Sequence, residues 1–586
     1  MLSFLLWTSA AGDSHRQLNS VAQTFGDLFA QFLPSAVHVH TRSFNDAYLA
    51  WFELPVQGWR PPFFQEDGQT AAWAADFPLN GHMVLQNHGI ATDSIAFLPP
   101  LARAIQAHPK RILEQLVPPM LLLWEDKATG ELHLLNDALG HAQLYRYTSH
   151  GNFALSNRLF AFKALSAPLT PCADEWAANC SFGWFPLNRT GFKEVRFVDP
   201  STHFKWTGAG TPQQQSLNVL DSWIKPPSAS RCKCLEMARM ALLNYIIATW
   251  PLFSDASGGL TGGFDSRSIF ATYRYLGLKL RPRVKGPANN YDVILSKRLA
   301  AMAGMDLTLK PTAELPPVSV ESIRASVQAA LVWQAGNMDN GQQISFLPAG
   351  RRLPIGSVNV MGHDGLIGRG FFARMIGANK LDPHLYQQHM VRLLANKIPD
   401  FFLPEIKARV QMLIQRMCQQ GAEHGLSEAK QLDFLYLFER TRRWSSGSQH
   451  SQTSQVLAPF LNGQFIRAVY SYKNADFQEN VFHRYIINLH APDWIQVPFE
   501  RELKKRDKQE RRLSRDREPP GSWMLSNNSN YFNRHLFWQQ AGAPLLKEGL
   551  ATGHFWREIF DAAKIKEHTF TAGDELVMLC QLEKVL

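Results

Sequence analysis

Short apolar runs and alternating apolar and polar residues mark the first 210 residues of the chain. Met120–Trp124 and Glu131–Leu135 are two such runs, and the turn sequence DKATG separates them. Leu144–Tyr147 and Phe153–Ser156 repeat the pattern on either side of SHGN. Runs of this length bounded by turn residues predict β-strands joined as hairpins. We therefore expect a strand-rich N-terminal region that contains a meander of hairpins.

The pattern changes after Pro212. Ser230–Thr249 carries apolar residues at helical spacing, and Pro251 follows it, so a helix is predicted to end there. The polar sequences TPQQQS and KPPSAS lie between the two patterns and are typical of a linker. Since one hydrophobic core stops growing at about 250 to 300 residues, a chain of 586 residues is predicted to form two domains, residues 1–215 and 228–586.

Helical and strand patterns alternate in the second domain. Ser268–Leu276 and Asp292–Met302 have helical spacing, while Leu280–Val284 and Leu307–Leu309 are short apolar runs typical of strands. Strands that alternate with helices indicate a parallel sheet. The sequence thus predicts an α/β fold with two domains, and mostly helical additions from about Pro383 onward.

The net charge of the chain excludes few classes of binding partner. The chain has 60 basic and 50 acidic residues, a formal net charge of +10, and the run Arg501–Glu518 supplies +4 of it with nine basic and five acidic residues. Such a run without interleaved aromatic residues is typical of a solvated helix or a mobile loop. A nucleic-acid partner is therefore not expected, and an anionic small ligand such as ATP fits the remaining charge.

The cysteines and the apolar segments indicate the compartment. The six cysteines are scattered, and only Cys232 and Cys234 are close, at a spacing that suits neither a zinc site nor a redox pair. No segment reaches the 18 or more apolar residues of a membrane helix, and no basic residue precedes the apolar start MLSFLLW, as a secretory signal requires. We expect free thiols in a cytoplasmic protein.

The sequence SGGLTGGFDSR, residues 257–267, contains candidate chemistry. A glycine-rich turn before a helix presents backbone N–H groups to an anion, and the hydroxyls of Thr261 and Ser266 add donors. Asp265 fits such a turn when Mg²⁺ neutralises it. The turn is neither a Walker A loop nor a dinucleotide fingerprint. From these residues alone, a surface turn that happens to be rich in glycine remains the alternative.

The six residues TGGFDS resemble the pyrophosphate loop of the asparagine synthetase superfamily. The resemblance implies that Thr261, Gly262, Gly263 and Ser266 hold the pyrophosphate of ATP and that Asp265 binds Mg²⁺. The family places a strand, a glycine and an acidic residue next along the chain. Here Gly286 and Asp292 take these positions, and the resemblance implies that both lie at the nucleotide.

The segment VNVMGHDGLIGRGFF, residues 358–372, is similar to a second motif of this superfamily. Its glycines are retained, but the family's general-base Glu falls on His363, and a metal-binding carboxylate falls on Leu366, which cannot bind Mg²⁺. Either Asp364 supplies the second carboxylate, or Asp265, the phosphates and water hold the metal. Lasso peptide cyclases of the superfamily also have a His here, so the resemblance implies that His363 takes a proton from an amine nucleophile.

Two later segments, residues 440–462 and 483–499, resemble further parts of the synthetase domain. The first ends in Pro-Phe-Leu-Asn, with Asn462 where the family has Asp. In the second, His483 and Arg484 are implied to contact the pyrophosphate, while the family's Lys of that region has no clear counterpart. The resemblance covers roughly residues 230 to 500.

The N-terminal region resembles the glutaminase domain of asparagine synthetases in Asn136–Gly140 and in the strands around Leu144 and Phe153. That family's nucleophile is an N-terminal cysteine. This chain has Leu2 there, and its first cysteine is Cys172. Covalent hydrolysis of glutamine is therefore not expected, and the domain is predicted to be a retained scaffold or part of a peptide-binding surface.

These observations together predict an ATP-dependent, AMP-forming carbon–nitrogen ligase. The resemblance favours a macrolactam synthetase of the lasso peptide type, with ATP and Mg²⁺ as cofactors and His363, Asp364 and Arg484 as catalytic residues. Its partners would be a precursor peptide, a companion leader peptidase and a leader-binding protein. Two alternatives remain: an amide ligase for a small metabolite with a free amine or ammonia, and a degenerate homologue without activity, for which Leu366 is the main argument.

Overall fold

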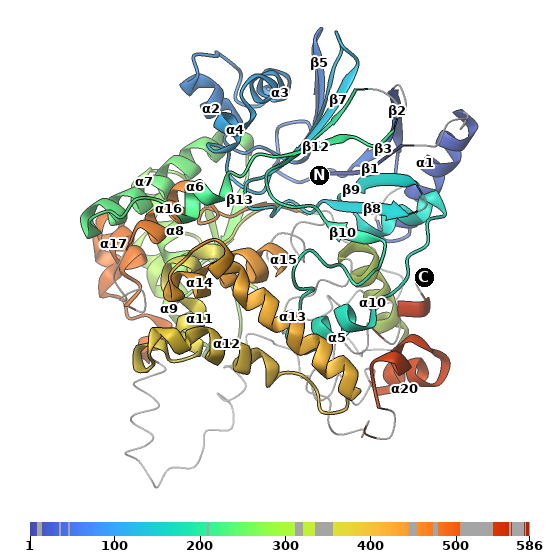
Figure 1. Cartoon of the computed structure of the whole chain (residues 1–586). Coiled ribbons are helices and arrows are strands. Elements are labelled where there is room, and N and C mark those ends of the chain that lie inside the picture. Colours follow the sequence, from blue (N-terminus) through green and yellow to red (C-terminus); the bar gives the residue numbers. More distant parts are fainter. Residues whose placement is uncertain are drawn as a thin grey trace.

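The computed structural model shows a mixed α/β protein with two antiparallel sheets and one parallel sheet (Figure 1). The structure describes residues 1–8, 15–33, 37–44, 47–149, 151–207, 210–310, 320–334, 356–444, 454–472, 479–503, 543–561, 564, 579, 582–584 and 586. The antiparallel sheets take their strands from residues 2–216, and the parallel sheet takes its strands from residues 256–457. The predicted domain limits of 1–215 and 228–586 are compatible with this division and stay a prediction.

The first antiparallel sheet has six strands, with the first strand of the chain near its centre. Its spatial order is β10 (Val195–Phe197), β8 (Tyr145–Ser149), β9 (Asn152–Ser156), β1 (Leu2–Thr8), β3 (Ala47–Glu53) and β2 (His40–Phe44). All seven residues of β1 are buried. The apolar start of the chain is thus a core strand paired with β3 and β9.

The second antiparallel sheet also has six strands. They lie in the order β12 (Gln213–Ser216), β11 (Thr202–Trp206), β7 (Glu131–Asn136), β6 (Leu121–Asp126), β5 (Thr70–Asp76) and β4 (Phe64–Glu66). Trp51 of β3 and Trp73 of β5 meet edge to face, with ring centroids 5.6 Å apart. The buried faces of the two sheets therefore pack together as a sandwich.

The four predicted strands of residues 120–156 are confirmed, but the single meander is wrong. The chain pairs β6 with β7 in one sheet and β8 with β9 in the other, so the two hairpins face each other across the sandwich. The predicted linker sequence TPQQQS also contains a strand, β12, which pairs with β11. All four residues of β12 are exposed, because it forms the edge of its sheet, and an exposed edge strand needs no apolar alternation.

Helices α2 (Gly81–Asn87), α3 (Leu98–Ala107) and α4 (Pro109–Leu113) interrupt the strand-rich region between β5 and β6. The remaining helices of this region are α1 (His15–Ala30), α5 (Ala173–Phe182) and α6 (Leu220–Ile224). Prolines at the first positions of α3 and α4 start these helices where no N–H is needed.

The third sheet is parallel, as predicted. Its order is β15 (Thr308–Lys310), β14 (Arg281–Lys285), β13 (Ala256–Gly259), β16 (Val358–Val360) and β17 (Gln455–Leu457). The predicted strands at 280–284 and 307–309 are β14 and β15, each shifted by one residue. The predicted helices at 230–249 and 292–302 are confirmed as α7 (Arg231–Thr249) and α9 (Tyr291–Met302).

The C-terminal part is mostly helical, also as predicted, and its helices group away from the antiparallel sheets in Figure 1. They are α11 (Phe371–Met375), α12 (Tyr386–Ala395), α13 (Pro404–Glu423), α14 (Glu428–Phe434), α15 (Arg442–Trp444), α16 (Gly463–Ser471), α17 (Val481–His490) and α20 (Ala543–Thr552), with α8 (Phe264–Tyr275) and α10 (Val320–Gln334) before them. Among the described residues, no helix combines the length and the apolarity that crossing a membrane requires.

A buried arginine joins the C-terminal helices to the N-terminal sandwich. Arg442 follows a π-helical segment, Leu435–Thr441, and is 1% exposed. Its guanidinium donates to the carbonyls of Gly140 at 2.9 Å and Val198 at 2.7 Å, and to Oδ1 of Asn188 at 3.1 Å. Gly140 has a φ of +65°, and an added Cβ would lie 2.9 Å from Nε of Arg442. A glycine is thus required for the guanidinium to approach.

The buried carboxyl of Asp76 gives the folded protein a pH dependence that we predict here. Burial first, and then the charge of Asp137, raise the pKa of Asp76 to about 7. Between the ordinary pKa of Asp near 4 and this value, the folded state holds a proton that the unfolded state has lost. Stability should therefore fall as the pH rises through this window, by up to about 1.4 kcal/mol per pH unit.

Thermal unfolding measured between about pH 4.5 and about pH 8 tests this prediction. The range starts near the pKa of Asp in the unfolded chain and ends above its pKa in the folded protein. Asp76→Asn should unfold at a higher temperature than the unchanged protein at the alkaline end and converge with it at the acidic end. The exposed Asp306→Asn serves as the matched control. A difference between Asp76→Asn and the unchanged protein that does not vary with pH would contradict the assignment.

Candidate functional site

The parallel sheet reverses its strand order beside β13. From β13 the chain adds β14 and β15 on one side, then returns to place β16 and β17 on the other. In open α/β sheets, ligands bind outside the carboxyl ends of the strands at such a reversal. Here the segments that leave the carboxyl ends of β13 and β16 are the two glycine-rich motifs of the sequence. The fold thus brings both predicted motifs to one place.

In the loop after β13, two hydroxyl side chains accept hydrogen bonds from the backbone of the loop itself. The backbone N–H of Thr261 donates to Oγ of Ser266 at 3.1 Å, and that of Gly263 donates to Oγ1 of Thr261 at 3.1 Å. The two hydroxyl oxygens are 2.8 Å apart. Helix α8 begins directly after this loop, at Phe264, four residues before the predicted start. Asp265 and Ser266 therefore lie in the first helical turn and not in the turn before it.

Helix α9 lies on the other side of the loop and makes two hydrogen bonds to its backbone. Asp292 accepts a hydrogen bond from the N–H of Gly262 at 2.8 Å. Ser296, one turn later, donates to the carbonyl of Leu260 at 2.6 Å. Gly286, directly after β14, has a φ of +146°, in the region that favours glycine. Asp292 therefore shapes the loop directly, and its predicted place at the nucleotide stays a prediction.

The carboxylate of Asp265 lies between an arginine and a histidine. Nη1 of Arg369 donates to Oδ2 at 2.6 Å, and Nε2 of the fully buried His483 lies 2.9 Å from Oδ1, without the alignment of a hydrogen bond. Burial alone would raise the pKa of Asp265, but Arg369 and His483 outweigh it and hold the pKa below its ordinary value. Burial lowers the pKa of His483, which favours the neutral ring. Asp265 is thus an ionised carboxylate that Arg369 neutralises.

The segment after β16 packs its glycines against this carboxylate. A Cβ on Gly365 would lie 2.4 Å from Oδ1 of Asp265 and 3.0 Å from Nε2 of His483, and one on Gly362 would lie 3.0 Å from Cβ of Asp265. The backbone of His363 opens a 3₁₀ turn, His363–Arg369. The placement of the His363 side chain lies outside the described part of the structure, so its predicted role as a base stays a prediction.

The donors at the site do not fit a resident Mg²⁺ ion in this arrangement. Asp364 is 1% exposed, and Leu366 packs against the hydrophobic core. The oxygens of Asp265 already face Arg369 and His483, and no three His, Cys, Asp or Glu side chains of the described chain come together as ligands. The predicted Mg²⁺ site at Asp265 and Asp364 would first require Arg369 to leave Asp265.

Two stacked aromatic rings connect the start of α8 to the segment that contains Phe499. Phe264 and Phe499 are stacked, with centroids 3.8 Å apart, and the guanidinium of Arg267 lies 3.9 Å from the Phe499 ring. Arg267 is fully buried and donates to the carbonyls of Val497 at 2.6 Å and Pro498 at 3.0 Å. The segment 494–499 is thus fastened to the first turns of α8, which explains why the sequence keeps an arginine next to Ser266.

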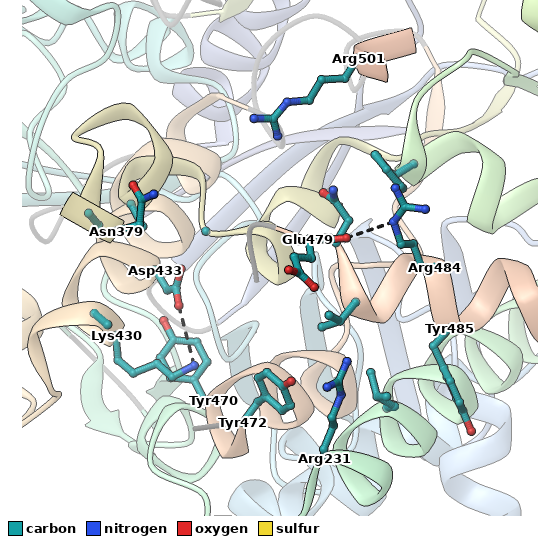
Figure 2. Close-up of a pocket in the computed structure, with 18 of the residues that line it drawn as sticks. Arg231, Asn379, Lys430, Asp433, Tyr470, Tyr472, Glu479, Arg484, Tyr485 and Arg501 are labelled. Atoms are coloured by element: carbon teal, nitrogen blue, oxygen red, sulfur yellow. Dashed lines mark hydrogen bonds and ion pairs between the residues drawn. The ribbon is translucent and has the colours of Figure 1, made fainter. Parts of the chain in front are cut away.

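A cavity of about 1370 Å³ opens beside the site. Phe264, Gly370 and Arg484 line its edge toward the two motifs, and Figure 2 shows the polar side chains that surround it. Arg484 is held by Oε1 of Glu502 at 2.7 Å and the carbonyl of Glu479 at 3.2 Å. The cavity exceeds the roughly 300 to 1,000 Å³ of most small-molecule pockets, so it has room for a peptide.

The cavity wall formed by α14 and α16 carries a buried polar group that the sequence did not reveal. Nζ of Lys430 lies 3.8 Å from Oδ2 of Asp433 (Figure 2). It also donates to the carbonyl of Val469 at 2.7 Å. Burial raises the pKa of Asp433 to about 6. The hydroxyl of Tyr470 is buried and has no hydrogen-bond partner among the described residues. These residues are helical and show no motif, so only the fold identifies them.

Arg369 and Arg374 are the other residues that sequence reasoning missed. Arg369 lies between Gly368 and Gly370 of the second motif, and a cation between two glycines of that motif was the available signal. Asn462, which replaces an Asp of the family, caps α16 by accepting from the N–H of Gln464 at 2.9 Å. The charged run beyond residue 503 lies outside the described residues.

The described cysteines are free thiols, and Cys172 is poorly suited to be a nucleophile. Burial first, and then the charge of Glu175, raise the pKa of Cys172 to about 12, so at pH 8 about one thiol in 10⁴ is ionised. We expect iodoacetamide to modify the exposed Cys232 well before Cys172, as measured by peptide mass spectrometry over time. Equal rates at these two positions would contradict the burial of Cys172, and Cys172→Ser should retain the activity of the unchanged protein.

Comparisons with protein families, curated proteins and solved structures add little to what the two motifs indicate about this chain. No protein-family model matches this chain, and no curated protein matches it. The solved structure of the allosteric regulatory enzyme of purine biosynthesis matches 54% of this chain and 82% of its own, with 11% identity and a TM-score of 0.26. Glutamine phosphoribosylpyrophosphate amidotransferase from B. subtilis, complexed with ADP and GMP, matches 63% of this chain and 77% of its own, with 11% identity and a TM-score of 0.25. Scores of this size do not establish a shared fold.

Proposed function

We propose that the protein is an ATP-dependent carbon–nitrogen ligase that closes a macrolactam ring in a peptide, in the manner of the lasso peptide cyclases it resembles. The observation that carries the proposal is the meeting of two glycine-rich motifs at the strand reversal between β13 and β16, beside a cavity with room for a peptide. The N-terminus of α8 and the hydroxyls of Thr261 and Ser266 suit a nucleotide phosphate there.

The reaction has two steps. A side-chain carboxylate oxygen of the peptide attacks the α-phosphorus of ATP, the bond to the bridging oxygen breaks, and pyrophosphate leaves an acyl-AMP behind. The peptide's N-terminal amine then attacks the acyl carbon, loses a proton, and displaces AMP. Holding amine and acyl-AMP together in the cavity lowers the barrier by ~7 to 11 kcal/mol through orientation. His363 would accept the proton, and Arg484 lies at the cavity edge to steady the carboxylate.

We further infer that residues 1–215 form a glutaminase-like sandwich. Cys172 in this region is half-buried, and its raised pKa opposes ionisation, so this thiol does not serve as a nucleophile. In the proposed reaction the nucleophile is an amine already present on the substrate. The sandwich then serves as a scaffold, and its docking through Arg442 supports the helices that line the cavity.

Synthetic peptides test the proposal. Each carries a free N-terminal amine and one internal Asp or Glu, and is incubated with the full chain and MgATP. Release of AMP and the loss of one water from the peptide, measured by mass spectrometry, are the expected result. The N-acetylated peptide is the matched control: it should still permit pyrophosphate release but form no ring.

Two outcomes favour other functions. AMP release with free amino acids and ammonium, but with no peptide, would indicate the small-metabolite ligase. The cavity volume of about 1370 Å³ argues against a small substrate. Binding of ATP without AMP release under any of these conditions would indicate a degenerate homologue that lacks catalysis.

A further inference from the structure

Arg369 occupies the place beside Asp265 that the sequence motif reserves for a divalent cation. Its Nη1 lies 2.6 Å from Oδ2 of Asp265, and its Nε donates to Oδ1 of Asn480 at 2.7 Å. The guanidinium also lies 5.3 Å from the centre of the Phe264 ring. These three contacts fix the position of the Arg369 guanidinium. Arg369 is therefore a built part of the site.

Two further arginines add positive charge without a counterion. Neither Arg374 of α11 nor Arg501 at the cavity edge makes a side-chain hydrogen bond or ion pair with the described residues. Burial first, and then the charges of Arg369 and Arg501, lower the pKa of Arg374 to about 10. Arg374 thus lies within electrostatic reach of Arg369, Arg501 and Asp265, and the two unpaired guanidinium groups favour an anionic ligand.

The same site contains a fully buried histidine. His483 is 0% exposed, and its Nε2 lies 2.9 Å from Oδ1 of Asp265. Asp265 lies in the first turn of α8, and the dipole of a helix favours an anion at its N-terminal end.

We propose that Arg369, Arg374 and Arg501 bind the pyrophosphate group of the nucleotide directly, with Arg369 in place of a metal ion at Asp265. The proposal rests on the nucleotide-binding function proposed above. Arginine forks match phosphate oxygens with two parallel hydrogen bonds, whereas a Mg²⁺ ion at Asp265 would lie against the guanidinium and be repelled. Asp265 is then a positioning residue that holds Arg369.

Inorganic pyrophosphate is the probe. Calorimetric titration of the full chain is carried out in EDTA and again in Mg²⁺, with thermal unfolding to confirm that each variant is folded. Pyrophosphate should bind in EDTA with an affinity within about threefold of that in Mg²⁺. Arg369→Gln should weaken binding in EDTA at least about tenfold, the loss expected for a charge-assisted pair. The exposed Arg409→Gln is the matched control and should change nothing.

Asp265→Asn separates the two roles of the carboxylate. A positioning residue that carries a like charge opposes the anion, so this variant should bind pyrophosphate in EDTA at least as tightly as the unchanged protein. Binding that requires Mg²⁺ and is lost in Asp265→Asn would overturn the proposal and make Asp265 a metal ligand, with the ligase proposal intact. If MgATP does not bind either, the nucleotide-binding function itself fails.

Discussion

Gly365→Ala is expected to lower AMP formation at least about 100-fold while the protein stays folded. The added methyl would lie 2.4 Å from Oδ1 of Asp265, 2.8 Å from its Cγ and 3.0 Å from Nε2 of His483. These atoms cannot remain in place, so the carboxylate moves away from Arg369, or the 3₁₀ turn moves away from α8. A displacement of about 1 Å at a reacting site costs on the order of 100-fold in rate.

The measurement for Gly365→Ala combines AMP release with pyrophosphate titration. Gly68→Ala is the control, because a methyl there meets no atom within 4 Å. Both variants should keep the unfolding temperature of the unchanged protein within a few degrees. If Gly365→Ala forms AMP at the normal rate, the close packing of this turn on Asp265 has no part in the reaction.

Arg442→Met is expected to destabilise the protein by about 2 to 6 kcal/mol, at about 1 to 3 kcal/mol for each buried carbonyl left without a donor. The change removes the donor of the carbonyls of Gly140 and Val198, while the amide oxygen of Asn188 keeps a hydrogen bond from Nη2 of Arg443. These acceptors belong to the N-terminal part of the chain, whereas Arg442 follows the π-helical segment. The contact between these parts should therefore weaken before either part unfolds.

Chemical unfolding followed by tryptophan fluorescence, with limited proteolysis alongside, measures this loss. The unchanged protein should resist cleavage, and Arg442→Met should release fragments at denaturant concentrations that the unchanged protein withstands. Arg409→Met removes an exposed arginine from α13 and should show no such change. Equal resistance of Arg442→Met and Arg409→Met would mean that the buried guanidinium contributes no net stability.

Local patterns predicted most strands and helices, because they depend on neighbours in the chain. The helix at 231–249 and the strands at 281–285 and 308–310 followed from spacing alone. The assignment of β6–β7 and β8–β9 to different sheets did not, since β9 pairs with β1, a strand at the other end of this region. The start of α8 was misplaced because its first turn, Phe264–Arg267, has no apolar spacing that would indicate a helix.

The sequence predicted the glycine-rich motifs of the candidate site, but it did not predict which of the charged side chains pair. The sequence located the loop at 261–266 and the glycines at 362–370, and the structure brings them together. It did not reveal that Arg369 pairs with Asp265 or that Arg374 remains unpaired among the described residues. Such pairs join residues far apart in the chain, and side-chain type alone does not specify which carboxylate a given arginine meets.

The order of the parallel sheet has a consequence for biosynthesis. β13 needs β16, nearly a hundred residues later, and Asp265 meets His483 only after the whole helical part has been made. At roughly 5 to 20 residues per second, the ribosome takes on the order of ten to forty seconds to travel from the loop to its last partner. The antiparallel sandwich is complete long before, at Ser216. Until β16 has been made, the emerging chain carries β13 with one edge unpaired, and unpaired strand edges make folding intermediates prone to aggregation.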